Sequence, residues 1–96
     1  MIRREGRRLV LSGSVTLANV PAIFEEGRRH IEEGVRVVDL GEVGDIDSSL
    51  LAMLLAWLRE AKNRNQELAF VNLPEALQTI AKLYGVQSLL PLARAH

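Results

Sequence analysis

The chain has 96 residues, and 48% of them are hydrophobic, which is enough for one compact core and too little for two. Twelve basic and twelve acidic residues balance each other, so the composition does not indicate a broad basic face for nucleic acid. Cysteine is absent, which excludes disulfides, thiolate metal ligands and thiol catalysis and is typical of a reducing compartment. We therefore expect a single domain over residues 1–96, in the cytoplasm and without nucleic acid as a partner.

No segment of the sequence is suited to cross a membrane. The longest apolar run, residues 50–58, is far shorter than the roughly 20 residues that a membrane-spanning helix needs. The arginine-rich start is not followed by an apolar stretch of the length that a secretory signal has. Any membrane association is therefore expected to be indirect, through a partner.

The start of the chain predicts a strand. Residues 8–12, with three apolar side chains at their centre, predict a short strand, and the turn residues Gly13 and Ser14 are expected to end it. An earlier strand over residues 2–5, turning back at Gly6, is left open because of its arginine content.

The next segment predicts an amphipathic helix from residue 17 to residue 33. Pro21 is tolerated in the first turn, where its missing N–H has no intrahelical acceptor, and Gly34 is a natural stop. The apolar positions recur three or four apart and so share one stripe. The stripe consists of Val20, Ile23, Phe24, Gly27 and Ile31.

The remaining chain alternates strands and helices. Residues 35–40 are rich in β-branched side chains, which indicates an interior strand, and residues 41–47 are expected to connect it to the next helix. That helix is predicted over residues 49–65, followed by a strand over 67–73 and a helix over 74–84. The order predicts an α/β domain with a mixed, mostly parallel β-sheet covered by helices.

The last helix is expected to bury one stripe before it stops at Gly85, and residues 89–92 are expected to dock on the core. The stripe consists of Leu77, Ile80, Ala81 and Tyr84.

Asp47, Ser48 and Ser49 place three good capping side chains before the central helix. The first amides of a helix lack intrahelical acceptors, so one of the three is expected to cap it. A serine hydroxyl at a helix N-terminus is also well placed for phosphorylation, because phosphate charge meets the positive end of the helix dipole. Capping and a functional role are compatible here.

The central helix carries more apolar surface than one sheet can cover. At 100° per residue its large apolar side chains spread over roughly 200°, about twice the stripe of an ordinary surface helix. The middle of this arc should face the core, which leaves Met53 and Trp57 on one rim and Leu55 on the other. A neighbouring helix, a partner protein or a second copy of the chain could cover the rims.

Three segments carry a family resemblance. Residues 11–16 resemble a strand ending in Gly-Glu-Leu-Asp or Gly-Glu-Leu-Thr, and residues 37–49 resemble a strand followed by an Asp-Ser-Ser-Gly turn. Both are signatures of STAS domains, the fold shared by bacterial anti-sigma-factor antagonists, sulfate-transporter tails and MlaB-type proteins. Residues 54–57 and 80–86 resemble MlaB-type proteins in particular, and the match covers almost the whole chain.

The resemblance implies roles for particular residues. In the antagonists the first serine of the turn is phosphorylated, and that position is Ser48. In MlaB-type proteins the same position carries a hydroxyl residue that touches the ATPase subunit of a phospholipid-transporting ABC complex. Antagonists usually have Asp at the position of Thr16 and Gly at that of Leu50, and both departures favour the transporter.

The sequence therefore predicts a non-catalytic accessory subunit, without cofactor or metal, that binds the MlaF-like ATPase of an MlaFEDB-like transporter maintaining outer-membrane lipid asymmetry. It would be cytoplasmic and peripheral to the inner membrane. The alternative is an anti-sigma factor antagonist switched by phosphorylation of Ser48, and a homodimerising module is also left open. The turn, the helix and the resemblance together predict the partner-binding residues Thr16, Asp47, Ser48, Ser49, Leu50, Met53 and Trp57.

Other chemistry has little support. His30 and His96 lack the neighbours expected of a metal ligand or general base, so both are expected to be solvated. Asp39 is predicted in a buried strand, and Asp45 and Asp47 are predicted in a turn where they can cap the following helix, which disfavours a cation site.

Overall fold

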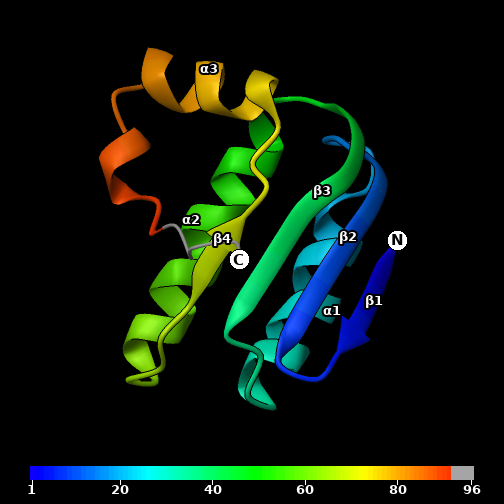
Figure 1. Ribbon diagram of the computed structural model, residues 1–96, viewed down its shortest axis with the longest axis vertical. Coiled ribbons are helices and arrows are strands. Elements are labelled where there is room, and N and C mark those ends of the chain that lie inside the picture. The colour runs from blue at the N-terminus through cyan, green and yellow to red at the C-terminus, as the bar shows by residue number, and fades with distance from the viewer. Residues whose placement is uncertain (92–96) are drawn as a thin grey trace.

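The computed structural model describes residues 1–91 and has one four-stranded sheet. Its order is β1-β2-β3-β4, with β1 antiparallel to β2 and the remaining neighbours parallel (Figure 1). The strands are β1 (Ile2–Glu5), β2 (Arg8–Val15), β3 (Val37–Ile46) and β4 (Ala69–Val71). The helices are α1 (Val20–Glu32), α2 (Ser48–Asn63), α3 (Glu75–Leu83) and the short 3₁₀ helix η1 (Gln87–Leu89). The α/β class and the mixed, mostly parallel sheet are confirmed.

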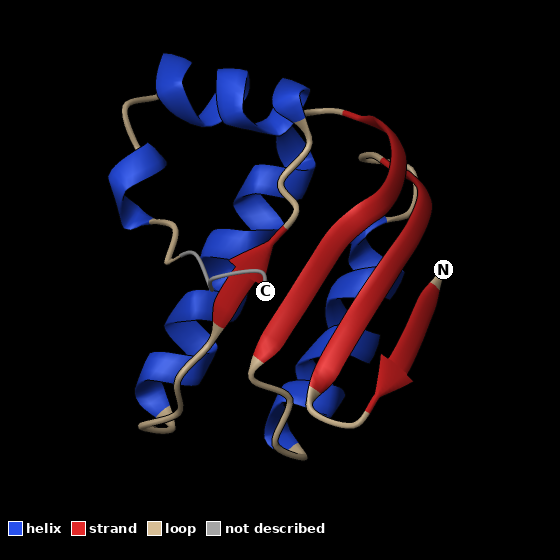
Figure 2. Ribbon diagram, viewed as in Figure 1, coloured by secondary structure: helices blue, strands red, loops and turns tan. Residues whose placement is uncertain are grey.

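Two helices, α1 and α2, lie behind the sheet, and α3 crosses the edge where β3 and β4 end (Figure 2). The strand residues that face these helices are fully buried, because alternate side chains of a strand point to opposite faces. They are Leu9, Leu11, Val38, Leu40 and Phe70. No helix among residues 1–91 is long and apolar enough to span a bilayer.

The hairpin that the sequence left open is present. Ile2 pairs with Leu11 and Glu5 with Arg8, and Gly6 makes the turn with a φ of +64°, which glycine adopts without steric cost. Arg4 ties the hairpin to the end of α1 through an ion pair of 2.7 Å with Glu33.

Two predicted boundaries in the centre of the sheet are wrong. Gly13 does not end β2, which continues to Val15 through an irregular register, with Gly13 at a φ of +79°. Residues 41–46 are not a connection but the second half of β3, and only Asp47 separates β3 from α2. The reason is mutual pairing: Gly13 lies opposite Val43 and Val15 opposite Ile46, so each extension satisfies the backbone of the other.

Smaller differences concern the end of the chain. The strand predicted over 67–73 is limited to Ala69–Val71, and Tyr84, expected on the buried stripe of α3, is 61% exposed because it lies at the C-cap beyond the last packed turn. Leu90 docks on the core as expected, whereas Leu89 is exposed. Leu92 and His96 lie outside the described residues.

Candidate partner-binding surface

Asp47 organises the turn before α2. One of its carboxylate oxygens accepts hydrogen bonds from the Ser49 amide, at 2.9 Å, and from the Ser49 hydroxyl. The other oxygen accepts from the Leu17 amide at 2.9 Å, which joins the turn to the loop after β2. These bonds, the Ser49 hydroxyl first, hold the pKa of Asp47 below its usual value, because they favour the ionised form. Asp47 is therefore the N-cap residue of α2.

The loop after β2 is ordered by local hydrogen bonds. The Asn19 side chain accepts from the Thr16 amide at 3.0 Å and donates to the Ser14 carbonyl oxygen at 2.8 Å. Thr16 is half-buried, and Leu17 is 73% exposed. The structure thus brings Thr16 and Leu17, distant in sequence, next to the Asp47 turn.

The two serines of the turn differ in accessibility. Ser49 is half-buried, with its hydroxyl bound to Asp47. Ser48 is the first residue of α2 and is exposed. Ser48 is therefore the hydroxyl that this turn presents to an approaching molecule.

Three predicted binding residues are part of the core. Leu50 and Trp57 are fully buried, and Met53 is 2% exposed, so the prediction of an accessible rim at Met53 and Trp57, with Leu50 in the contact, is wrong. The cover is α1: the Trp57 indole N–H donates to the Phe24 carbonyl oxygen at 3.1 Å, and the ring lies against Gly27.

A sequence signal for this contact exists in Gly27. A glycine in the middle of a buried helical stripe indicates close approach of a bulky neighbour, because glycine otherwise costs about 1 kcal/mol in a helix. For the rim that contains Trp57, the neighbouring helix of the same domain is the correct alternative among those that the sequence left open.

The accessible side of α2 is the opposite one. Ser48 and Ala52 are exposed, and Leu55 is half-buried. They border a shallow groove of about 280 Å³ between α2 and the end of α3, lined by Ser48, Leu51, Ala52, Leu55, Tyr84 and Val86. We call these six residues the docking strip.

Exposed hydrophobic side chains lie on the segments near α2. Within residues 1–91, four of the five large exposed hydrophobic side chains lie on the elements around α2. They are Leu17 beside Asp47, Leu83 and Tyr84 at the end of α3, and Leu89 in η1. The sequence pattern missed Leu83, which lies off the predicted stripe of α3.

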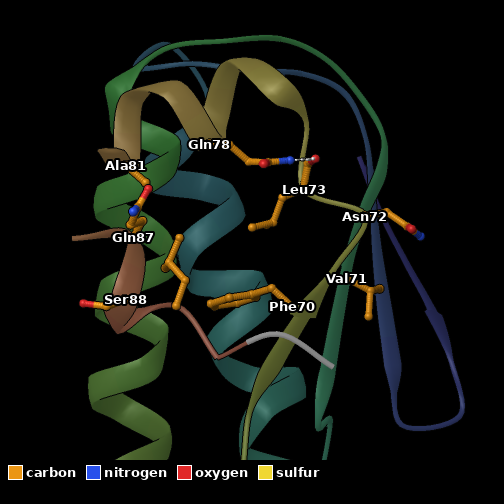
Figure 3. A pocket seen from close by; sticks show the side chains of 9 residues that line it. Phe70, Val71, Asn72, Leu73, Gln78, Ala81, Gln87 and Ser88 are labelled. Atoms are coloured by element: carbon orange, nitrogen blue, oxygen red, sulfur yellow. Dashed lines mark hydrogen bonds between the residues drawn. The ribbon is translucent and has the colours of Figure 1, made fainter. Parts of the chain in front are cut away.

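A larger cavity of about 430 Å³ lies between β4, α3 and η1 (Figure 3). The polar residues that line it are Asn72, Gln78, Gln87 and Ser88, all neutral, and Gln78 donates to the Leu73 carbonyl oxygen at 3.1 Å. None of the lining residues is ionisable, so they supply neither a general acid nor a charged anchor.

Asp39 lies on the face of the sheet away from α1 and α2. Its carboxylate accepts from Arg8 at 2.7 Å, from the Gly41 amide at 2.8 Å and from Asn72 at 3.0 Å. Burial raises the pKa of Asp39, but these hydrogen bonds outweigh burial and hold it below the usual value. The cluster links β2, β3 and the residue after β4, which is a structural role.

Comparisons with known proteins agree with this geometry. The family model described as Mlab, STAS domain matches residues 1–91. No curated protein sequence matches the chain. A chain of the Acinetobacter MlaFEDB complex in its ATP-bound Vtrans1 conformation superposes with a TM-score of 0.83 at 26% identity, over 97% of this chain and 100% of that one.

Two further solved structures are similar. The Vtrans2 conformation of the same complex gives a TM-score of 0.79 at 27% identity, over 92% of this chain and 95% of that one. The unphosphorylated anti-sigma factor antagonist SpoIIAA gives a TM-score of 0.73 at 16% identity, over 98% of this chain and 87% of that one. At that identity the SpoIIAA likeness shows the fold alone.

Proposed function

This chain belongs to the STAS domain family, and on that premise we propose that it is a non-catalytic accessory subunit of an MlaFEDB-like ABC transporter, binding its ATPase subunit. The transporter would maintain outer-membrane lipid asymmetry, and the chain would be cytoplasmic, reaching the inner membrane only through the ATPase. The observation that carries the proposal is the docking strip, an apolar groove that begins at the exposed Ser48.

Two further facts support the proposal. The whole length of a chain from the MlaFEDB complex superposes on this one at 26% identity, which is above that of the SpoIIAA likeness. The exposed Leu17, Leu83, Tyr84 and Leu89 provide apolar area whose burial by a partner is favourable, by about 25 cal/mol per Å² before the costs of association.

Phosphorylation of Ser48 is the second candidate, favoured by its exposed position at the start of α2. A phosphate there would interact with the helix dipole, but it would also meet the neighbouring Asp47 carboxylate. Because that carboxylate already caps the helix, we propose that Ser48 acts by contact. Stoichiometric phosphate on Ser48 after incubation with a switch-protein kinase and ATP would favour the antagonist role instead.

The proposal is tested by binding to the ATPase subunit of an MlaFEDB-like transporter from the same organism. Leu55→Glu places a charge in the docking strip, and we expect it to abolish binding while the far-ultraviolet spectrum stays native. Ala22→Glu, at an exposed position of α1, adds the same charge elsewhere and should bind normally. Unchanged binding by a folded Leu55→Glu variant would show that the docking strip is not the interface. A homodimer stays a prediction, and size-exclusion chromatography of the chain alone tests it.

A further inference from the structure

Arg59 continues the accessible side of α2 beyond the docking strip. It lies one turn after Leu55, and at 100° per residue it projects within about 20° of Ser48 around the helix axis. Arg59 is exposed. The guanidinium therefore stands on the same face as the groove, at its far end from the Asp47 turn.

Arg59 also lacks an ionic partner within the described part of the chain. Its neighbour Arg64 binds Glu32 at 2.6 Å and Glu60 at 3.5 Å, whereas no carboxylate of residues 1–91 lies within 4.0 Å of the Arg59 side chain. The other Lys and Arg side chains of residues 1–91 without a carboxylate within 4.0 Å are Arg7, Arg29, Lys62 and Lys82. Lys62 lies in the last turn of α2, where a cation interacts favourably with the helix dipole. Arg59 lies before that turn, so the dipole does not explain its charge.

We propose that Arg59 is a charged anchor beside the docking strip and binds a carboxylate of the ATPase subunit, an inference that rests on the proposed function. An arginine beside apolar side chains fits this role, because its planar fork binds a carboxylate through two hydrogen bonds and its stem packs on apolar surface. Burial of the neighbouring groove by the ATPase subunit would remove water from around the pair and so strengthen it.

An anionic lipid headgroup offers the same charge, but the surroundings of Arg59 favour a protein. Segments that recognise anionic membranes carry clusters of four to eight basic residues. Arg59 has instead the half-buried Leu55 and Leu58 beside it, and Glu60 follows it directly. Lys62, three residues further along α2, is the only other basic residue of that helix, and two cations fall short of such a cluster. An arginine next to apolar side chains is typical of a protein interface, where arginine is enriched.

The test measures binding of the full chain to the ATPase subunit at low and high salt. Arg59→Glu should raise Kd on the order of 100-fold and flatten its salt dependence, because the new carboxylate repels the one on the partner. Arg59→Lys should lose part of the affinity, since it keeps the charge without the fork. Arg29→Glu is the charge-reversal control, because Arg29 is an exposed cation of α1 that also has no carboxylate within 4.0 Å among residues 1–91, and this variant should bind as the unaltered chain does.

The outcomes separate the inference from the function on which it rests. If Arg59→Glu binds normally while Leu55→Glu does not, the docking strip is the interface and the Arg59 assignment is wrong. If the unaltered chain does not bind the ATPase subunit, the proposed function itself is overturned. Vesicles containing phosphatidylglycerol provide the last arm: retention of the unaltered chain but not of Arg59→Glu, with ATPase binding unaffected, would assign Arg59 to a headgroup and refute the protein carboxylate.

Discussion

Gly27→Ala is expected to destabilise the domain, although alanine is the better helix former. A Cβ at Gly27 would lie 2.1 Å from Cζ2 of Trp57 and 2.8 Å from two further indole atoms. Carbon atoms normally stay about 3.5–4.0 Å apart, and Trp57 is fully buried, so the ring has no free space in which to move.

The magnitude follows from two opposing terms. Overpacking of a dense core costs up to about 3 kcal/mol, and replacing glycine by alanine in a helix interior gains about 1 kcal/mol. We expect a net loss of about 2 kcal/mol, equivalent to a fall in Tm of roughly 8–16 °C for a domain of this size. Urea unfolding measures it, followed by circular dichroism and by the fluorescence of Trp57, the single tryptophan.

Two controls make the result interpretable. Glu26→Ala, at the adjacent exposed position, should change stability by less than about 0.5 kcal/mol. In a Trp57→Phe background the smaller ring should reduce the cost of Gly27→Ala, which a double-mutant cycle measures as a coupling. A Gly27→Ala variant as stable as the unaltered chain would refute the close packing of α1 on the indole.

Two further predictions concern the core and the polar cluster on the sheet. Trp57→Glu should unfold the domain, because removing a buried tryptophan side chain already costs about 3–5 kcal/mol and the new carboxylate would have no partner; a native far-ultraviolet spectrum would contradict its core position. Asp39→Asn should be about 1 kcal/mol less stable at pH 7 through weaker bonds to Arg8 and the Gly41 amide. Because the pKa of Asp39 is lowered on folding, its contribution to the free energy of unfolding is complete above about pH 4 and is lost as the pH falls further. Urea unfolding at pH 7 and pH 3 should show that the free energy of unfolding falls less for the variant than for the unaltered chain. An equal fall would contradict the lowered pKa of Asp39.

Local patterns in the sequence were sufficient for the elements and for the turn that begins α2. Apolar spacing of three to four residues predicted α1 and α3, and β-branched residues predicted the first half of β3. Asp47 was among the predicted caps because its side chain acts on an amide two residues away. The family, too, was recognisable from short segments, since its signature lies in continuous stretches of chain.

The tertiary structure decided which helices and side chains are neighbours. The sequence showed that α2 has too much apolar surface for one sheet, but the same residues would satisfy a partner or a second helix equally well. Packing of α1 through Gly27 covers Trp57, and the path of the chain at the end of α3 places Tyr84 and Leu55 in the same groove. The accessible surface that starts at Ser48 therefore lies on the side of α2 where Leu55 was predicted as the second rim, whereas the predicted rim at Met53 and Trp57 is buried, because burial depends on long-range contacts that no local periodicity specifies.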